Sequence, residues 1–155
     1  MGKTTAHNLL KNSGFTLMEL LIVIALIALL ASAFLASGNY FTQVGKGRDA
    51  DRKSDLAMLK VKMEDYYNDN NRYPDQPLMT NCNVALGSYI AKIPCDPQDS
   101  NPYFYETDAA GSWYRIYADL EYKKDPVITD VGCSGGCGPG NSYNYGVSSP
   151  NTTLQ

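Results

Sequence analysis

The sequence predicts an α+β protein in which one long N-terminal helix, apolar in its first half, packs on a small antiparallel sheet. Three observations support this prediction. Residues 15–36 are apolar with three exceptions, and residues 48–70 carry apolar side chains at helical spacing. From residue 103 onward, short runs alternate aromatic and polar residues between turn signals. The length of 155 residues allows one small domain beside the apolar segment.

The apolar segment is long enough to cross a membrane. Its 22 residues would span about 33 Å as a helix, close to the roughly 30 Å hydrocarbon core of a bilayer. Lys3, His7 and Lys11 precede it, and such a positive leader would stay on the cytoplasmic side. Glu19 lies one turn inside the apolar run, where an ionisable group is costly and is usually present for function. We therefore expect a single-pass membrane helix with one functional acid.

Three fates are open to this N-terminus. A signal peptidase could remove it, since Ala31, Ser32 and Ala33 form a small-x-small cleavage sequence. It could remain as an uncleaved anchor, or the leader could be cut ahead of the apolar run. Glu19 argues against the first fate, because a discarded export signal has no use for a carboxylate.

Residues 11–24, KNSGFTLMELLIVI, resemble the leader and mature start of the type IV pilin superfamily. The resemblance implies that a prepilin peptidase cuts between Gly14 and Phe15 and methylates the new amino terminus of Phe15. It also implies that Glu19 is the assembly residue and that the fold is the pilin fold. The implied segments are a cleaved leader (1–14), a transmembrane and filament-core helix (15–37), an amphipathic continuation (38–71) and a loop-rich, β-sheet head (72–155).

The spacing of Phe15 and Glu19 has a physical reason. The free amine of Phe15 is a cation, and Glu19 is an anion slightly deeper along the same helix. If neighbouring helices are staggered by about one turn, the amine of one copy meets the carboxylate of the next. A buried pair then replaces a lone buried charge, which costs several kcal/mol. This pairing would select one register in a polymer.

The second half of the long helix should bury one face and end before Pro74. Because a residue that precedes proline disfavours the α region, residues 70–74 should terminate it. Residues 69–74 also resemble the segment that closes the long helix in major pseudopilins of type II secretion. We expect the helix to be continuous, or nearly so, from Phe15 to about Asn70. Pilins commonly have a proline at the position of Ala36, and this proline is absent here. Gly38, Gly45 and Gly47 are therefore the candidates for loosening the helix instead. The expected buried positions are Leu56, Leu59, Met63 and Tyr66 or Tyr67.

The remainder should form a loop followed by strands. Residues 75–102 contain four prolines and Gly87, which predicts a loop with at most a short helical turn. Residues 103–107, a turn at 108–111 and residues 112–121 predict a hairpin. Residues 127–128 and 143–145 could add one or two short strands. The alternating positions expected to face the helix are Tyr114, Ile116, Ala118 and Leu120.

Four cysteines lie in the part expected outside the membrane: Cys82, Cys95, Cys133 and Cys137. An even number in a small exported domain predicts disulfides, for which three pairings exist. Short loops close easily, which favours Cys82 with Cys95 and Cys133 with Cys137. Zinc is the rival, but a mature chain without the leader would have no histidine, and the spacings match no common zinc finger.

Other ligand sites have weaker signals, and we expect no cofactor. The glycine-rich residues 132–140 lack the lysine and the strand-to-helix context of a phosphate loop, so a surface loop is favoured. Residues 151–153 fit a glycosylation acceptor pattern, or a flexible tail. Major pseudopilins bind calcium in their C-terminal region, but no motif matches closely here, and surface acids are favoured over a site. The weak candidates for calcium are Asp119, Glu121, Asp125 and Asp130.

These features favour a structural subunit over an enzyme. The single histidine, His7, lies in the leader, so the mature chain would lack an imidazole for nucleophilic catalysis. The formal net charge of −3 leaves no basic field for a nucleic-acid backbone.

We expect a precursor in the cytoplasmic (inner) membrane that is cleaved and polymerises with itself into an extracellular filament. The resemblance implies a prepilin peptidase, an assembly ATPase and a membrane platform protein as partners. A major type IV pilin is favoured because residues 143–151 look like the C-terminal end of some pilins. A major pseudopilin of type II secretion is the second choice, and a monomeric secreted or membrane-anchored binding domain is the alternative from another class.

Overall fold

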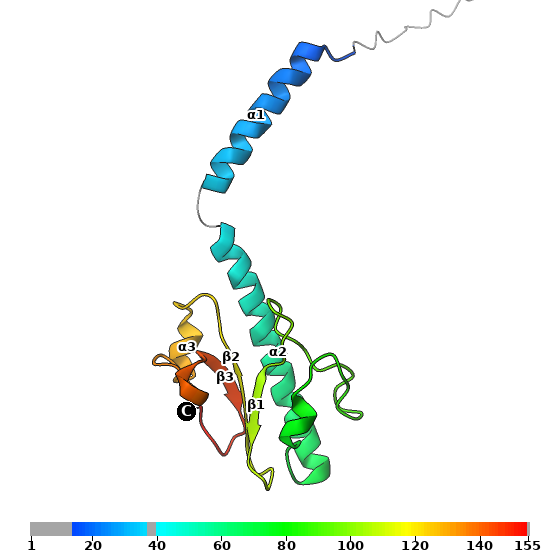
Figure 1. The fold of residues 1–155 in the computed structure, drawn as a ribbon, viewed down its shortest axis with the longest axis vertical. Helices are drawn as coiled ribbons and strands as arrows, with labels where there is room; N and C mark the ends of the chain where they lie inside the picture. Colours follow the sequence, from blue (N-terminus) through cyan, green and yellow to red (C-terminus); the bar gives the residue numbers. More distant parts are fainter. Residues whose placement is uncertain (1–13, 37–39, 155) are drawn as a thin grey trace, which may run out of the picture. The chain divides into compact units, whose positions relative to one another are not determined.

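The computed structural model describes residues 14–36 and 40–154. The chain divides near residue 40 into two units, which are described separately. Figure 1 shows the elements, which in order are α1 (Leu17–Ala36), α2 (Tyr40–Asn70), η1 (Gln76–Met79), β1 (Phe104–Thr107), β2 (Tyr114–Ala118), α3 (Pro126–Asp130), η2 (Pro139–Asn141) and β3 (Tyr145–Ser148). The predicted continuity of the long helix through Gly38 concerns residues outside the described part.

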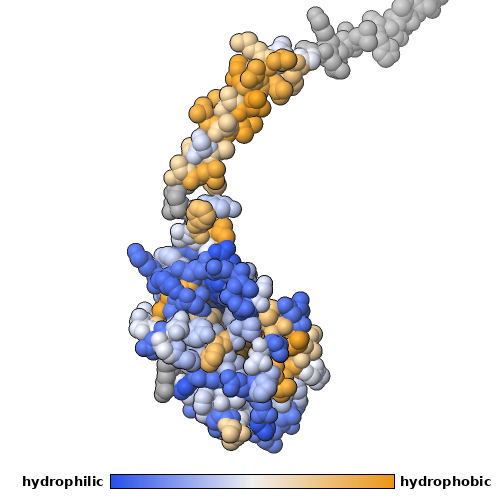
Figure 2. Space-filling model, viewed as in Figure 1, coloured by the Kyte–Doolittle hydropathy of each residue, from blue (hydrophilic) through white to orange (hydrophobic). Residues whose placement is uncertain are grey.

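Helix α1 is apolar and fully exposed. Its 20 residues rise about 30 Å, which is enough to cross a bilayer by length and composition. None of them is buried, and Figure 2 shows the helix as an almost uniformly hydrophobic surface. The hydroxyl of Ser32 donates to the carbonyl of Leu29 at 2.8 Å, so this polar group is satisfied within the helix. Helix α1 therefore needs an apolar environment supplied from outside itself.

Thr16 caps the N-terminus of α1. The Thr16 hydroxyl accepts a hydrogen bond from the backbone N–H of Glu19 at 3.2 Å. This is the Thr side of a capping box, whose signature is Ser or Thr followed three residues later by Glu. The cap satisfies one of the backbone donors left open at a helix start, so the helix begins directly after Thr16.

Helix α2 runs without interruption through Gly45 and Gly47, two of the glycines that were candidates for loosening it. Its core face is the predicted one, because Leu56, Leu59 and Met63 are all buried. The helix ends at Asn70 by a mechanism other than the proline effect. Asn71 adopts a φ of 53°, and its N–H donates to the carbonyl of Tyr67 at 2.8 Å. Asparagine tolerates this left-handed conformation, which stops the helix three residues before Pro74.

The sheet has three antiparallel strands in the order β1–β2–β3. Ile116 at its centre lies opposite Tyr105 on one side and Val147 on the other. The four side chains predicted to face the helix are all buried, which confirms the alternation. Tyr117 points to the opposite face but is also fully buried, because the ring of Tyr143 stacks on it at 5.5 Å. The loop between η2 and β3 therefore covers the second face of the sheet at this point.

The predicted strand at residues 127–128 is wrong, because these residues belong to helix α3. Asp125 accepts a hydrogen bond from the backbone N–H of Val127, and Pro126 occupies the first helical position. Both are helix-start signals, and they override the β-branched pair Val127 and Ile128.

The last strand begins at Tyr145, later than the predicted residue 143. Tyr143 forms only an isolated bridge with Cys137. The side chain of Asn144 binds both the N–H and the carbonyl of Leu120, at 2.7 and 2.9 Å. A side-chain amide thus replaces the backbone pairing that would have extended the strand.

Candidate assembly site and its support in the head

The predicted cleavage position lies in an accessible segment. Gly14, Phe15 and Thr16 are exposed and precede the first helical residue, and Phe15 is 81% exposed. A Cβ atom built on Gly14 meets no atom within 4 Å. The described structure therefore places no steric demand on this glycine, and any demand for it comes from outside the chain.

Glu19 lies in the first turn of α1, four residues after Phe15. Its carboxylate has no hydrogen bond or ion pair among residues 14–36 and 40–154. A carboxylate in a first helical turn is favoured by the positive end of the helix dipole. The group is thus ionisable, exposed and open to a cation from another molecule.

Thr16 is a residue whose role the sequence reasoning missed. The pattern Thr16-Leu17-Met18-Glu19 is a capping-box signature, and it could have been found from the spacing alone. The donor is the backbone N–H of Glu19, which any residue except proline would supply, so the cap depends on the Thr16 side chain and leaves the Glu19 carboxylate unused. The candidate assembly site is therefore Gly14, Phe15, Thr16 and Glu19 on one short segment.

Comparisons with known proteins agree with this geometry. A family model described as the prokaryotic N-terminal methylation motif matches residues 9–35. The chain is 35% identical over 105 residues to the type II secretion system core protein G of Aeromonas hydrophila, which covers 60% of this chain and 71% of that protein. The chain belongs to the type IV pilin superfamily. Its relatives are pilins and pseudopilins, which are structural proteins.

Two further relatives represent both branches of the superfamily. The type IV major pilin protein PilA of Myxococcus xanthus is 24% identical over 139 residues, or 90% of this chain and 54% of that protein. Core protein G of Escherichia coli is 28% identical over 143 residues, or 80% of this chain and 94% of that protein. No solved structure matches the chain. The predicted superfamily and the α+β fold with an apolar N-terminal helix are confirmed.

A buried ion cluster joins α2 to the rest of the head. Arg52, only 2% exposed, donates to both carboxylate oxygens of Asp96 at 2.7 and 2.8 Å. It also donates to Asp49 at 2.8 Å and to Glu121 at 2.9 Å. Asp49 is 1% exposed and accepts from the backbone N–H groups of Glu121 and Tyr122 at 2.9 and 2.8 Å. These contacts fix α2 to the segment that follows β2 and to the loop at Asp96.

The arginines of the cluster lower the pKa of two of its acids, Glu121 and Asp96. The hydrogen bond from Arg48 to Glu121, at 2.6 Å, and the further bond from Arg52 hold the pKa of Glu121 down at about 2, against the effect of burial. Burial raises the pKa of Asp96, but the hydrogen bonds and charge of Arg52, together with backbone N–H groups, outweigh this effect, so the pKa is lowered. The same contacts raise the pKa of Arg52. These acids are therefore structural anions rather than proton donors.

Three of the four weak calcium candidates are held in separate interactions. Asp119 pairs with Lys123 at 2.6 Å, and Asp125 pairs with Lys53 at 2.7 Å while it caps α3. Glu121 belongs to the Arg52 cluster. Over the described ranges, no group of three or more His, Cys, Asp or Glu side chains could hold a metal ion. Asp119, Glu121, Asp125 and Asp130 therefore stay weak candidates for calcium, named from the sequence alone.

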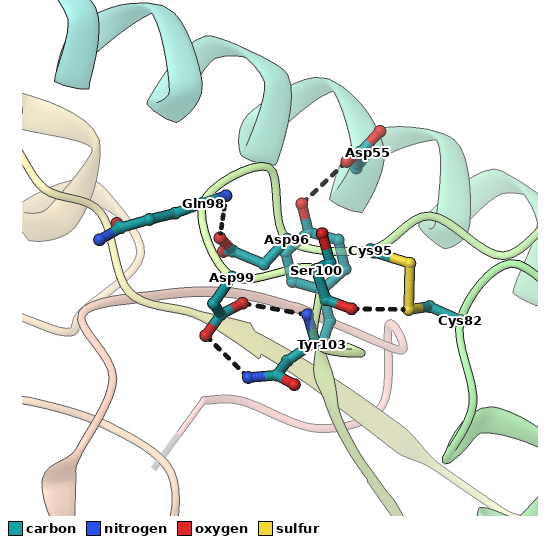
Figure 3. The surroundings of a disulfide bond; sticks show 9 residues. Asp55, Cys82, Cys95, Asp96, Gln98, Asp99, Ser100 and Tyr103 are labelled. Atoms are coloured by element: carbon teal, nitrogen blue, oxygen red, sulfur yellow. Dashed lines mark hydrogen bonds between the residues drawn. A yellow bond between two sulfur atoms is a disulfide. The ribbon is translucent and has the colours of Figure 1, made fainter.

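The four cysteines form two disulfides, Cys82–Cys95 and Cys133–Cys137, the pairs favoured by the sequence. Figure 3 shows the first of them beside Asp96 and beside the hydrogen bond from Tyr103 to Asp55 of α2, which is 2.8 Å long. No cysteine is left as a free thiol, so none offers zinc a thiolate.

Proposed function

We propose that this chain is a major pilin. A precursor held in the cytoplasmic membrane by α1 is cut between Gly14 and Phe15 and polymerises through α1 into an extracellular filament. One observation carries this proposal: an exposed, almost entirely apolar helix carries an unpaired carboxylate, Glu19, in its first turn, five residues after an accessible glycine, Gly14. The resemblance to pilins supports a prepilin peptidase, an assembly ATPase and a membrane platform protein as partners.

The apolar surface of α1 explains why the helix must always be covered. Fourteen large apolar side chains between Phe15 and Leu35 are exposed in the isolated chain. Full burial of each contributes about 1.5–3 kcal/mol, so leaving all of them in water would cost on the order of 20–40 kcal/mol. The helix is therefore covered either by lipid or by the same helix of other copies. A filament is the state in which other copies replace lipid.

The pairing of Phe15 with Glu19 sets how those copies align. Four residues of helix correspond to about 6 Å, or roughly one turn. A neighbour shifted by that amount brings its Glu19 carboxylate to the freed amine of Phe15. In an apolar environment an unpaired carboxylate is strongly destabilising, so registers without this contact are disfavoured.

The test is the replacement Glu19→Ala in the full chain, with Ser32→Ala as the matched control. Ser32 is the other polar residue inside α1, but its hydroxyl is already bonded to Leu29. We expect Glu19→Ala to insert and to be processed to a chain that starts at Phe15, yet to be depleted from the sheared filament fraction. The control should yield filaments normally. Normal filament yield from Glu19→Ala would defeat the pairing argument.

N-terminal sequencing of the mature protein separates this function from the other class. A start at Phe15 supports a filament subunit. A start after Ala33 would support a soluble secreted domain, and retention of Met1 or Gly2 would support a simple anchor.

A pseudopilin of type II secretion is the second candidate, supported by the similarity to core protein G of Aeromonas hydrophila. Both candidates use the same processing and the same helix. They differ in where the polymer is found and in what its loss abolishes. Deletion of a pilin removes surface filaments and leaves protein secretion intact, whereas deletion of a pseudopilin blocks secretion.

A further inference from the structure

The head has a cleft, at the end where α2 begins, to which the proposed function gives no role. Its volume is about 530 Å³. One wall comes from the first residues of α2 and the other from the segment between β2 and α3. Figure 2 shows that the surface around this end of the head is hydrophilic. The lining residues are Phe41, Thr42, Gly45, Glu121, Tyr122, Lys123 and Lys124.

The cleft carries positive charge that the head does not neutralise. Lys124 is exposed and has no ion pair among the described residues. Lys123 pairs with Asp119, but both side chains are more than half exposed, and such surface pairs contribute little. Lys46 lies beside the cleft, with its Nζ 4.2 Å from the centre of the Tyr122 ring. The carboxylate in the lining, Glu121, is already bound by two arginines.

An exposed aromatic ring borders these lysines. Phe41 is 83% exposed, which is unusual for so large an apolar side chain. Phenylalanine together with lysines is typical of amphipathic helices that lie at the boundary between lipid headgroups and acyl chains. Phe41 follows Ala36, the last residue of α1, by five positions. Whatever the arrangement of the two units, the covalent chain keeps Phe41 within about 18 Å of the end of α1.

We propose that this cleft binds the phosphate headgroups of anionic bilayer lipids while the subunit is stored in the membrane. Lys46, Lys123 and Lys124 supply the positive charge, the Thr42 hydroxyl can donate to a phosphate oxygen, and Phe41 enters the interface. The proposal rests on the proposed function, because it requires α1 to lie in a bilayer. It adds a second membrane contact, which must be broken when a subunit moves into a filament.

The experiment uses the full chain in vesicles whose lipids carry brominated acyl chains. The reporter is Phe41→Trp, and the parent chain, whose single tryptophan is Trp113, gives the background. We expect stronger quenching of the reporter in vesicles that contain phosphatidylglycerol than in vesicles of phosphatidylcholine alone. The difference should shrink when the salt concentration is raised.

Charge reversal tests the lysines. Lys123→Glu combined with Lys124→Glu should remove the extra quenching, because the loss of each lysine weakens docking by roughly fivefold and of the pair by about 25-fold, and the two new carboxylates add repulsion. The matched control, Lys60→Glu with Lys92→Glu, makes the same change in net charge at exposed positions elsewhere on the head and should keep the extra quenching.

Several results would overturn the proposal. Equal quenching in the two kinds of vesicle, or equal loss in the control variant, would do so. If the double variant keeps its lipid contact but assembles poorly, the lysines contact a second copy instead. Flotation with the vesicles distinguishes failure of the lipid site from failure of the proposed function. A chain that floats but shows no lipid preference refutes only the lipid site. A chain that fails to float refutes the membrane stage of the proposed function as well.

Discussion

Replacement of Arg52 by methionine should destabilise the head far more than the loss of any exposed charged side chain. Arg52 donates four hydrogen bonds to three carboxylates, on Asp96, Asp49 and Glu121. Methionine keeps much of the apolar stem but leaves these anions without their shared partner, and Asp49 is only 1% exposed. Removal of one member of a buried ion pair typically costs about 3–5 kcal/mol.

That cost can be expressed as a change in melting temperature. The head unit spans 115 residues, for which 1 kcal/mol corresponds to roughly 4 °C. We therefore expect Arg52→Met to lower the Tm by about 12–20 °C. The assay is thermal unfolding of the full chain in detergent micelles, followed by near-ultraviolet circular dichroism. This signal reports tyrosine and tryptophan, which α1 lacks, so it follows the head.

Arg72→Met is the matched control. Arg72 also pairs with a carboxylate, that of Asp75, but both side chains are more than 40% exposed. An exposed pair of this kind contributes about 0–1 kcal/mol, so the Tm should fall by at most about 4 °C. A fall for Arg52→Met that is no larger than the control value would refute the reasoning. It would mean that the carboxylates find other partners or water when the guanidinium is lost.

Four other outcomes are expected. Gly14→Val should block leader cleavage, seen as an unchanged gel mobility, while the Tm of the head stays constant because a Cβ there meets no atom. Tyr114→Phe should leave the Tm unchanged or raise it by up to about 4 °C, which corresponds to about 1 kcal/mol, since the buried Tyr114 hydroxyl has no hydrogen-bond partner among the described residues. Replacing Cys133 and Cys137 by alanine should cost about 2 kcal/mol, from the short loop that they close, in denaturant titration. Because the folded pKa of Glu121 is depressed from 4.5 to about 2, its contribution is complete above pH 4.5 and lost towards pH 2, so the Tm should fall across that window.

The parts of the fold that the sequence predicted depend on patterns of several residues. The apolar run of α1 and the buried stripe of α2 repeat one signal over many turns, so single exceptions do not obscure them. The alternation in β2 also predicted the inward face correctly. The short separations within each cysteine pair, 13 and 4 residues, also favoured the two disulfides that the structure contains.

The parts that sequence reasoning missed depend on one residue or on distant partners. Val127 and Ile128 have high strand propensity, but Asp125 and Pro126 start a helix there. The burial of Tyr117 depends on Tyr143 in the loop between η2 and β3, and an alternating pattern within one strand does not reveal this contact. The Arg52 cluster joins positions 44 and 69 residues apart in sequence, so no local spacing marks it.

The head is built so that α1 can change its surroundings. No residue of α1 is buried, and within residues 14–36 and 40–154 the hydrophobic core begins at Leu56. Transfer of α1 from lipid to neighbouring helices therefore exchanges one apolar environment for another and removes no side chain from the core. Since apolar packing changes little in that exchange, the contacts that decide its direction are the polar ones. Under the two proposals, Glu19 gains a cation in the filament, and Lys123 and Lys124 lose anions when the subunit leaves the membrane.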